Sequence, residues 1–273
     1  MSVTWKSEDP PPDPVRPRGF VWFLIILRGL GIAAVFGIGY LALLLLLGLE
    51  RITGRRRGLG SLWMPVFVSR VTLRCMGLPR TVSGDLSDAK LLVANHASWL
   101  DILVLNALGP MAFVAKDDVE GWPGIGPIAK HTGTLFISRN PRASKDQAAR
   151  LSARLSFGER LLLFPEGTST DGRRVHPFRS SMFGGIDWDT PLEVQPISVV
   201  YHAPPGADPR FYGWWGDMDL GPSLLQVLAT RPQGNVTVTL HEVVSLRDFA
   251  NRKELVRRLE ATVRMGLEKD LQS

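Results

Sequence analysis

The residues best suited to catalysis lie between Asn95 and Asp101, in the segment Asn-His-Ala-Ser-Trp-Leu-Asp, directly after the apolar run 91–94. A histidine acts as a general base when one ring nitrogen reaches the proton to be removed and an acceptor holds the other nitrogen. Asp101 can be that acceptor if the chain turns between it and His96, as it would where a strand ends and a helix begins. The spacing therefore predicts a histidine–aspartate pair with the chemistry of a general base.

Two further segments place polar residues after apolar runs. The run 133–138 ends at Arg139, whose guanidinium could bind a phosphate or carboxylate through two parallel hydrogen bonds. The run 161–164 is followed by Pro165 and then by a polar group, Glu166, Gly167, Thr168 and Ser169. Backbone N–H groups and hydroxyls in this second segment could bind a substrate headgroup. A structural arginine and an ordinary turn are the alternatives, so neither segment alone predicts a site.

These residues need a scaffold, and the pattern of apolar runs predicts an α/β fold. Strand-like runs cover 91–94, 111–115, 133–137, 160–164, 194–200 and 235–241, and helix-like stretches cover 98–108, 144–157, 180–186 and 252–270. Such alternation is typical of a mainly parallel sheet covered by helices on both faces. Ligands of these sheets bind at the carboxyl ends of strands. His96 and Glu166 are therefore expected at one edge, while the strand 194–200 lines an acyl pocket or fills the core.

The chain before the α/β domain suggests a membrane anchor. Residues 1–19 form a proline-rich tail that is expected to be disordered, and 20–50 form the anchor. The 21 residues from Gly29 to Leu49 carry no charge, and about 20 apolar residues suffice to cross a bilayer. Residues 51–79 form a basic and amphipathic membrane-interface segment, and 80–273 form the domain. A single span, a re-entrant hairpin and a buried core helix remain open, and a removable signal peptide is not expected.

The composition of the chain limits the classes of molecule that it is expected to bind. The formal net charge is +6, but no segment combines basic and aromatic residues as nucleic-acid-binding motifs do. Together with the anchor, this charge favours anionic membrane lipids or an anionic carrier as partners, and no nucleic acid. Cys75 is the only cysteine, so we expect no disulfide within the chain and a packing role for this thiol. No cluster has the spacing of metal ligands, so no metal is expected.

Taken together and in this order, the segments resemble the glycerolipid (lysophospholipid) acyltransferase family. That family includes bacterial 1-acylglycerol-3-phosphate acyltransferases and lyso-ornithine lipid O-acyltransferases. Its Asn-His pair, four intervening residues and Asp match Asn95, His96 and Asp101, and its Phe-Pro-Glu-Gly-Thr block matches residues 164–168 without change. The other two blocks match Arg139 and the strand 194–200. A lysine that recurs about twenty residues after the histidine matches Lys116.

The resemblance implies acyl transfer without a covalent acyl-enzyme. His96 takes the proton from the free hydroxyl of a lysolipid, Asp101 orients the imidazole, and the oxygen attacks the thioester of acyl-CoA or acyl-carrier protein. No cofactor is implied beyond this co-substrate. The residues expected to bind substrate are Asn95, Lys116, Arg139, Glu166, Gly167, Thr168 and Ser169. The enzyme is expected at the inner (cytoplasmic) membrane, with its catalytic domain on the cytoplasmic side.

One departure from the family pattern bears on the acceptor lipid. Members that form phosphatidic acid usually follow Glu-Gly-Thr with arginine, whereas this chain has Ser169. We expect 1-acylglycerol-3-phosphate as the acceptor, with Arg173, Arg174 and Arg179 compensating for the missing cation; the alternative is lyso-ornithine lipid. A non-catalytic lipid-binding protein is disfavoured because His96, Asp101 and Glu166 are all present. A lipase-like hydrolase would need a Gly-x-Ser-x-Gly segment, which the sequence lacks.

Overall fold

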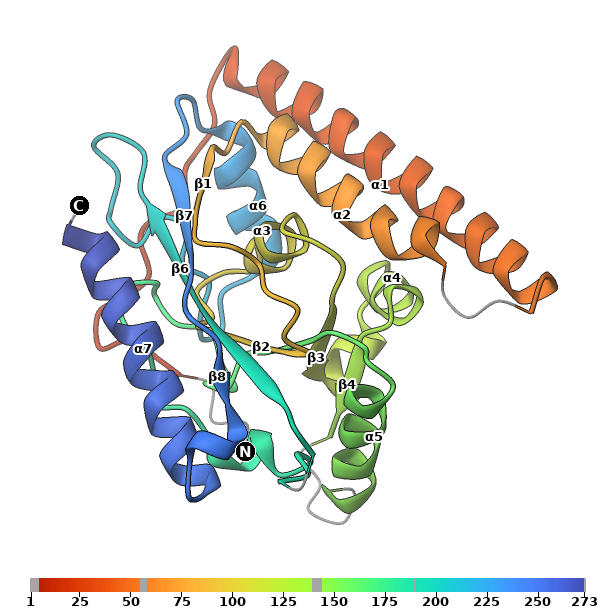
Figure 1. Ribbon diagram of the computed structural model, residues 1–273. Helices are drawn as coiled ribbons and strands as arrows, with labels where there is room; N and C mark the ends of the chain where they lie inside the picture. Colours follow the sequence, from red (N-terminus) through yellow and green to blue (C-terminus); the bar gives the residue numbers. More distant parts are fainter. Residues whose placement is uncertain (1–4, 55–57, 139–143, 189, 273) are drawn as a thin grey trace.

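The computed structural model describes residues 5–54, 58–138, 144–188 and 190–272, and these residues form a mixed sheet flanked by helices (Figure 1). The strands are β1 (Arg80–Ser83), β2 (Leu91–Ala94), β3 (Ala112–Lys116), β4 (Leu135–Ile137), β5 (Leu161–Leu163), β6 (Glu193–His202), β7 (Asn235–Leu240) and β8 (Val244–Ser245). Their order is β1-β7-β6-β2-β5-β3-β4, with β8 beside β6. The pairs along β6-β2-β5-β3-β4 are parallel, whereas β7 and β8 run antiparallel to β6. The predicted fold class is confirmed.

The helices account for most of the predicted helical stretches. They are α1 (Val21–Ile52), α2 (Leu59–Met76), α3 (Asp101–Asn106), α4 (Ile125–Thr132), α5 (Ser144–Ser156), α6 (Leu220–Ala229) and α7 (Arg252–Gln272), with short 3-10 turns η1 (Asp117–Gly121), η3 (Ser180–Phe183) and η4 (Leu246–Asp248). The helix predicted over 180–186 is only the turn η3, because its chain bends at two glycines, 184 and 185. The helices α4 and α6 were not predicted.

The central strand β2 explains how the sheet is held between its layers. All four of its residues are buried, which is typical of a strand in a sheet covered on both faces. Leu92 and Ala94 join the core beneath α2, α3 and α6, while Leu91 and Val93 join the core beneath α5 and α7. The carboxyl end of β2 is therefore fixed from both sides. Residues Asn95 to Asp101, which we name the catalytic segment after their expected role, begin there.

The long helix α1 lies against α2, and the two form a helical hairpin at one side of the molecule (Figure 1, red to orange). Within the described part of the chain, α1 is the one helix long and apolar enough to cross a membrane. Only Ile25, Gly39 and Leu43 of this helix are buried. Large apolar side chains along it are exposed, among them Phe23, Leu30 and Leu45.

The disorder expected for the proline-rich tail, residues 1–19, stays a prediction, and the structure describes this tail from Trp5 on. Residues 5–18 form no helix or strand, yet they follow a defined path along the domain, visible as the red trace in Figure 1. Contacts of Trp5, Lys6 and Pro10 hold this path.

Candidate active site

The candidate site lies at the carboxyl ends of adjacent parallel strands. The catalytic segment follows β2, Pro165 and Glu166 follow β5, and Lys116 ends β3. Because β5 pairs with both β2 and β3, these residues emerge on the same edge of the sheet. The expected meeting of His96 and Glu166 is seen directly, since the His96 backbone N–H donates to Glu166 Oε1 at 2.6 Å.

The His96 ring and the Asp101 carboxylate form the predicted pair, with 2.7 Å between Nδ1 and Oδ2. The helix α3 begins at Asp101, so the chain turns as the spacing requires. The same oxygen accepts the backbone N–H groups of Ala97 at 2.8 Å and Ser98 at 2.9 Å. The histidine side chain is 21% exposed and the aspartate side chain is fully buried. Nε2 is therefore the nitrogen left to take a proton.

Tyr201 completes the surroundings of Asp101. Its hydroxyl donates to Asp101 Oδ1 at 2.7 Å, so both carboxylate oxygens accept hydrogen bonds. Burial and the neighbouring Asp101 charge raise the pKa of Tyr201 well above its ordinary value, which keeps the hydroxyl protonated as a donor. With hydrogen bonds to both of its oxygens, the Asp101 carboxylate cannot rotate away from the imidazole. Tyr201 comes directly after the predicted strand 194–200 and was not predicted to belong to the site.

Phe164 fixes the imidazole from its face. The Phe164 and His96 rings are stacked, with centroids 4.2 Å apart and planes 18° from parallel. The phenylalanine belongs to the Phe-Pro-Glu-Gly-Thr block, so part of that block acts by orienting the candidate base. The motif match identified this residue but gave no reason for its side chain.

Glu166 supports the backbone of the site, since its side chain is completely buried, and its contact with substrate stays a prediction. Its two oxygens accept backbone N–H groups of His96 and His176, each at 2.6 Å. Burial raises the pKa of Glu166 to about 8, although the two backbone hydrogen bonds oppose this shift. The carboxyl therefore joins the catalytic segment to the loop after β5.

Asn95 likewise supports the backbone, and its substrate contact stays a prediction. The side chain is fully buried. Its Oδ1 accepts the Val199 backbone N–H at 2.8 Å, and its Nδ2 donates to the Val199 carbonyl at 2.9 Å. The amide thus continues the pairing of β2 with β6 by one step beyond Ala94 and Ile197. Only an amide side chain offers a donor and an acceptor in this arrangement.

The remaining residues that were predicted to bind substrate differ in how exposed their side chains are. Gly167 has φ +66°, and a Cβ there would lie 3.3 Å from Arg179, so the turn requires glycine. Thr168 is 4% exposed, and its hydroxyl oxygen accepts the Trp5 backbone N–H at 3.1 Å. Ser169 and Lys116 are half-buried. Arg139 lies outside the described residues.

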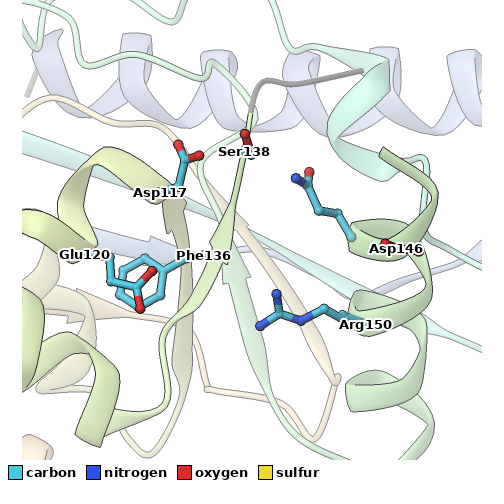
Figure 2. A pocket seen from close by; sticks show the side chains of 7 residues that line it. Asp117, Glu120, Phe136, Ser138, Asp146 and Arg150 are labelled. Carbon is cyan, nitrogen blue, oxygen red and sulfur yellow. The ribbon is translucent and has the colours of Figure 1, made fainter. Parts of the chain in front are cut away.

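A cavity of about 400 Å³ lies at the carboxyl ends of β3 and β4, on the same edge of the sheet (Figure 2). Its lining residues are Asp117, Glu120, Phe136, Ser138, Asp146, Gln147 and Arg150. Figure 2 shows Asp117 and Glu120 on one side, while Arg150 reaches in from α5 on the other. The lining thus carries both signs of charge. Among the described residues, no group of three or more His, Cys, Asp or Glu side chains could hold a metal ion.

Comparisons with known proteins agree with this geometry. A family model described as Acyltransferase matches residues 80–200. The chain is 41% identical to a lyso-ornithine lipid O-acyltransferase of Rhodobacter capsulatus, over 96% of each chain. It is 33% identical to a 1-acyl-sn-glycerol-3-phosphate acyltransferase of Neisseria gonorrhoeae, over 41% of this chain and 44% of that one. The crystal structure of a 1-acyl-sn-glycerophosphate acyltransferase from Thermotoga maritima has the same fold, with a TM-score of 0.64 at 22% identity over 91% of this chain and 95% of that one.

Proposed function

This chain belongs to the acyltransferase family, and we propose that it is a lyso-ornithine lipid O-acyltransferase. The main support for lyso-ornithine lipid as the acceptor is the 41% identity to such an enzyme over 96% of both chains. The similarity to the lysophosphatidate enzyme covers 41% of this chain. The sequence alone predicted lysophosphatidate as the acceptor, whereas the similarity to relatives favours the alternative, lyso-ornithine lipid. Ser169, in place of the family's arginine, agrees with an acceptor other than a phosphate monoester.

We propose that His96 is the general base of this transfer. Nε2 takes the proton of the lysolipid hydroxyl as that oxygen attacks the carbonyl carbon of the acyl thioester. The carbon–sulfur bond then breaks, an ester forms, and the thiolate takes up the proton from the imidazolium. The fully buried Asp101 stabilises the imidazolium, as in a serine-hydrolase triad in which the substrate hydroxyl replaces the serine. The donor is acyl-CoA or acyl-carrier protein.

The charges that line the cavity beside β3 and β4 support the proposal of an acceptor with a zwitterionic headgroup. Ornithine carries a carboxylate and an amine. The Arg150 guanidinium in the lining could bind the carboxylate, and the side chains of Asp117 and Asp146 could bind the amine. The strand β3 is separated from β2 by β5, so its end is about 10 Å from that of β2 at two strand spacings. Three carboxylates in the lining would repel a phosphate dianion.

We further propose that the enzyme rests on the cytoplasmic face of the inner membrane through its α1–α2 hairpin. Both flanks of α1 return to the same domain: Trp5 contacts Thr168 before it, and α2 packs on α3 after it. Tyr40, near the middle of α1, also bonds His131 of α4 at 2.9 Å. These ties along the helix favour the re-entrant alternative over a single span. Acyl thioester donors reach the domain from the cytoplasm.

The test is an acyl-transfer assay with purified enzyme in lipid vesicles and a labelled acyl donor. Lyso-ornithine lipid and lysophosphatidate are offered in parallel, each with acyl-CoA and with acyl-carrier protein. We expect ester product from lyso-ornithine lipid, and a loss of about 10²–10⁴-fold in kcat for His96→Ala. Product from lysophosphatidate alone would contradict the proposed acceptor. Full activity of His96→Ala would contradict the mechanism, whichever lipid is used.

A further inference from the structure

The first described residues of the chain lie on two loops beside the candidate site. The Trp5 backbone N–H donates to Thr168 Oγ1 at 3.1 Å, and the Trp5 ring is tilted against Trp215 with centroids 6.2 Å apart. The Arg174 guanidinium lies 5.4 Å from the centroid of the Trp5 ring. One tryptophan therefore contacts both the loop after β5, which carries Thr168 and Arg174, and the loop before α6, which carries Trp215.

Charged and backbone contacts extend this attachment along residues Trp5–Pro10, which we name the N-terminal strap. The Lys6 ammonium lies 2.5 Å from Asp217 Oδ2, and the Arg210 guanidinium donates to the Pro10 carbonyl at 3.1 Å. Pro10 is the first of three consecutive prolines, which end at Pro12. Proline-rich chain is already extended when free, so it loses less conformational entropy on docking than a flexible tail would.

The two loops that the strap joins hold the backbone of the catalytic segment. The Thr170 backbone N–H donates to the His96 carbonyl at 2.9 Å. The Trp214 backbone N–H donates to the Ala97 carbonyl, also at 2.9 Å. Each of these bonds lies within two residues of a strap contact, at Thr168 in one loop and at Trp215 in the other. The strap thus connects two loops that each hydrogen-bond the backbone of the catalytic segment.

We propose that the N-terminal strap is a positioning element that holds both loops against the catalytic segment and so favours the lipid hydroxyl over water. This inference rests on the proposed acyl transfer. The competing reaction uses the same base: a water oxygen attacks the thioester carbonyl, the carbon–sulfur bond breaks, and a free fatty acid and a thiol result. A transferase avoids this loss by keeping the site closed to water. Loops that separate would admit water while misplacing the lysolipid.

The ratio of thioester hydrolysis to acyl transfer tests the strap. Both products are measured with the acceptor that the wild-type enzyme uses, in full-length variants. We expect Trp5→Ala to lower transfer about tenfold and to raise the ratio by a similar factor, because small displacements in a site cost rate steeply. Trp5→Phe retains a ring and should keep a ratio near that of the wild type. A merely destabilised enzyme would lose both products in proportion, with no change in ratio.

A charge exchange provides the matched test. Lys6→Glu and Asp217→Lys should each raise the ratio, and the double variant should restore it, since the ion pair is then reformed in reverse. Arg16→Ala, an exposed cation of the same tail outside the strap, should leave the ratio unchanged. An unchanged ratio in Trp5→Ala, or no recovery in the double variant, would overturn the strap. A wild-type enzyme that acylates neither lysolipid would instead overturn the proposed function.

Discussion

Two buried carboxyl groups support the site at the residue scale in different ways. Asp101 bonds the His96 ring at 2.7 Å and is surrounded by donors. Glu166 bonds the backbone of the same histidine and that of His176. One carboxylate therefore orients the reacting group and the other fixes the chain that carries it. The two are not interchangeable, although both belong to the family motifs.

Glu166 should make stability depend on pH. Its pKa is raised from an ordinary 4.5 to about 8 in the folded protein. The folded state then binds more protons than the unfolded state between these values, so this group's contribution to stability falls as pH rises through about 8. We expect Glu166→Gln to flatten the decline of Tm over this range, measured by thermal unfolding in detergent. Its Tm should also be lower in acid, because one amide N–H₂ would face a backbone N–H.

The exposed Glu268→Gln serves as the control for this experiment. It removes one carboxyl group of the same type without touching the site, so it should keep the wild-type slope. A slope in Glu166→Gln equal to that of the wild type would show that another group causes the pH dependence.

At the scale of elements, the hairpin of α1 and α2 depends on one close approach. A Cβ placed on Gly39 would lie 2.3 Å from Val68 Cγ2, far inside van der Waals contact. Gly37, two residues earlier, has nothing within 4 Å of the same position. The glycine at 39 therefore lets the helices approach, whereas the one at 37 has no packing role.

Substitutions at these two glycines should separate packing from helix propensity. We expect Gly39→Ala to lower stability by about 1–3 kcal/mol, since the crowded contact forces the helices or Val68 to move. Gly37→Ala should be neutral or slightly stabilising, because alanine favours helix. The double variant Gly39→Ala/Val68→Ala should recover part of the loss. Thermal unfolding in detergent measures all three, and equal effects at both glycines would contradict the packing argument.

At the scale of the whole molecule, the position of α1 on the domain bears on the proposed attachment to a membrane. Arg28 donates to the carbonyls of Leu228 and Thr230 at 2.9 and 2.7 Å, which ties the beginning of α1 to α6. The far end is tied to α2, where Ser61 donates to Glu50 at 2.9 Å. Exposed apolar side chains of α1, among them Leu30 and Leu45, lie between these ties. The helix therefore lies along the domain with an apolar side exposed, and this is the side that the proposed attachment places against lipid.

Labelling from one side of the membrane should decide between a hairpin and a span. In a Cys75→Ser background, Thr53→Cys lies at the exposed end of α1 and Lys253→Cys lies on the exposed face of α7. We expect an impermeant maleimide to label both from the same side of sealed vesicles, because both flanks of α1 return to one domain. Labelling of Thr53→Cys only from the opposite side would contradict the hairpin and indicate a span.

The sequence by itself determined the features that depend on local pattern. Apolar periodicity gave the parallel sheet and the apolar helix, and a spacing of five residues gave the His96–Asp101 pair. The local pattern did not predict the helix α4, because its eight residues contain a proline and a glycine. Ser169 was a local clue to the acceptor that we propose, but the main support for that acceptor is the similarity to a lyso-ornithine lipid O-acyltransferase.

Only the tertiary structure decided what the other motif residues do. Asn95 and Asp101 find their partners Val199 and Tyr201 about one hundred residues along the chain, and Trp5 reaches Thr168 across 163 residues. A buried polar group must find a hydrogen-bond partner, but its residue type does not say which one. Substrate contact and structural support were therefore indistinguishable for Asn95 and Glu166 until the fold fixed their burial and partners.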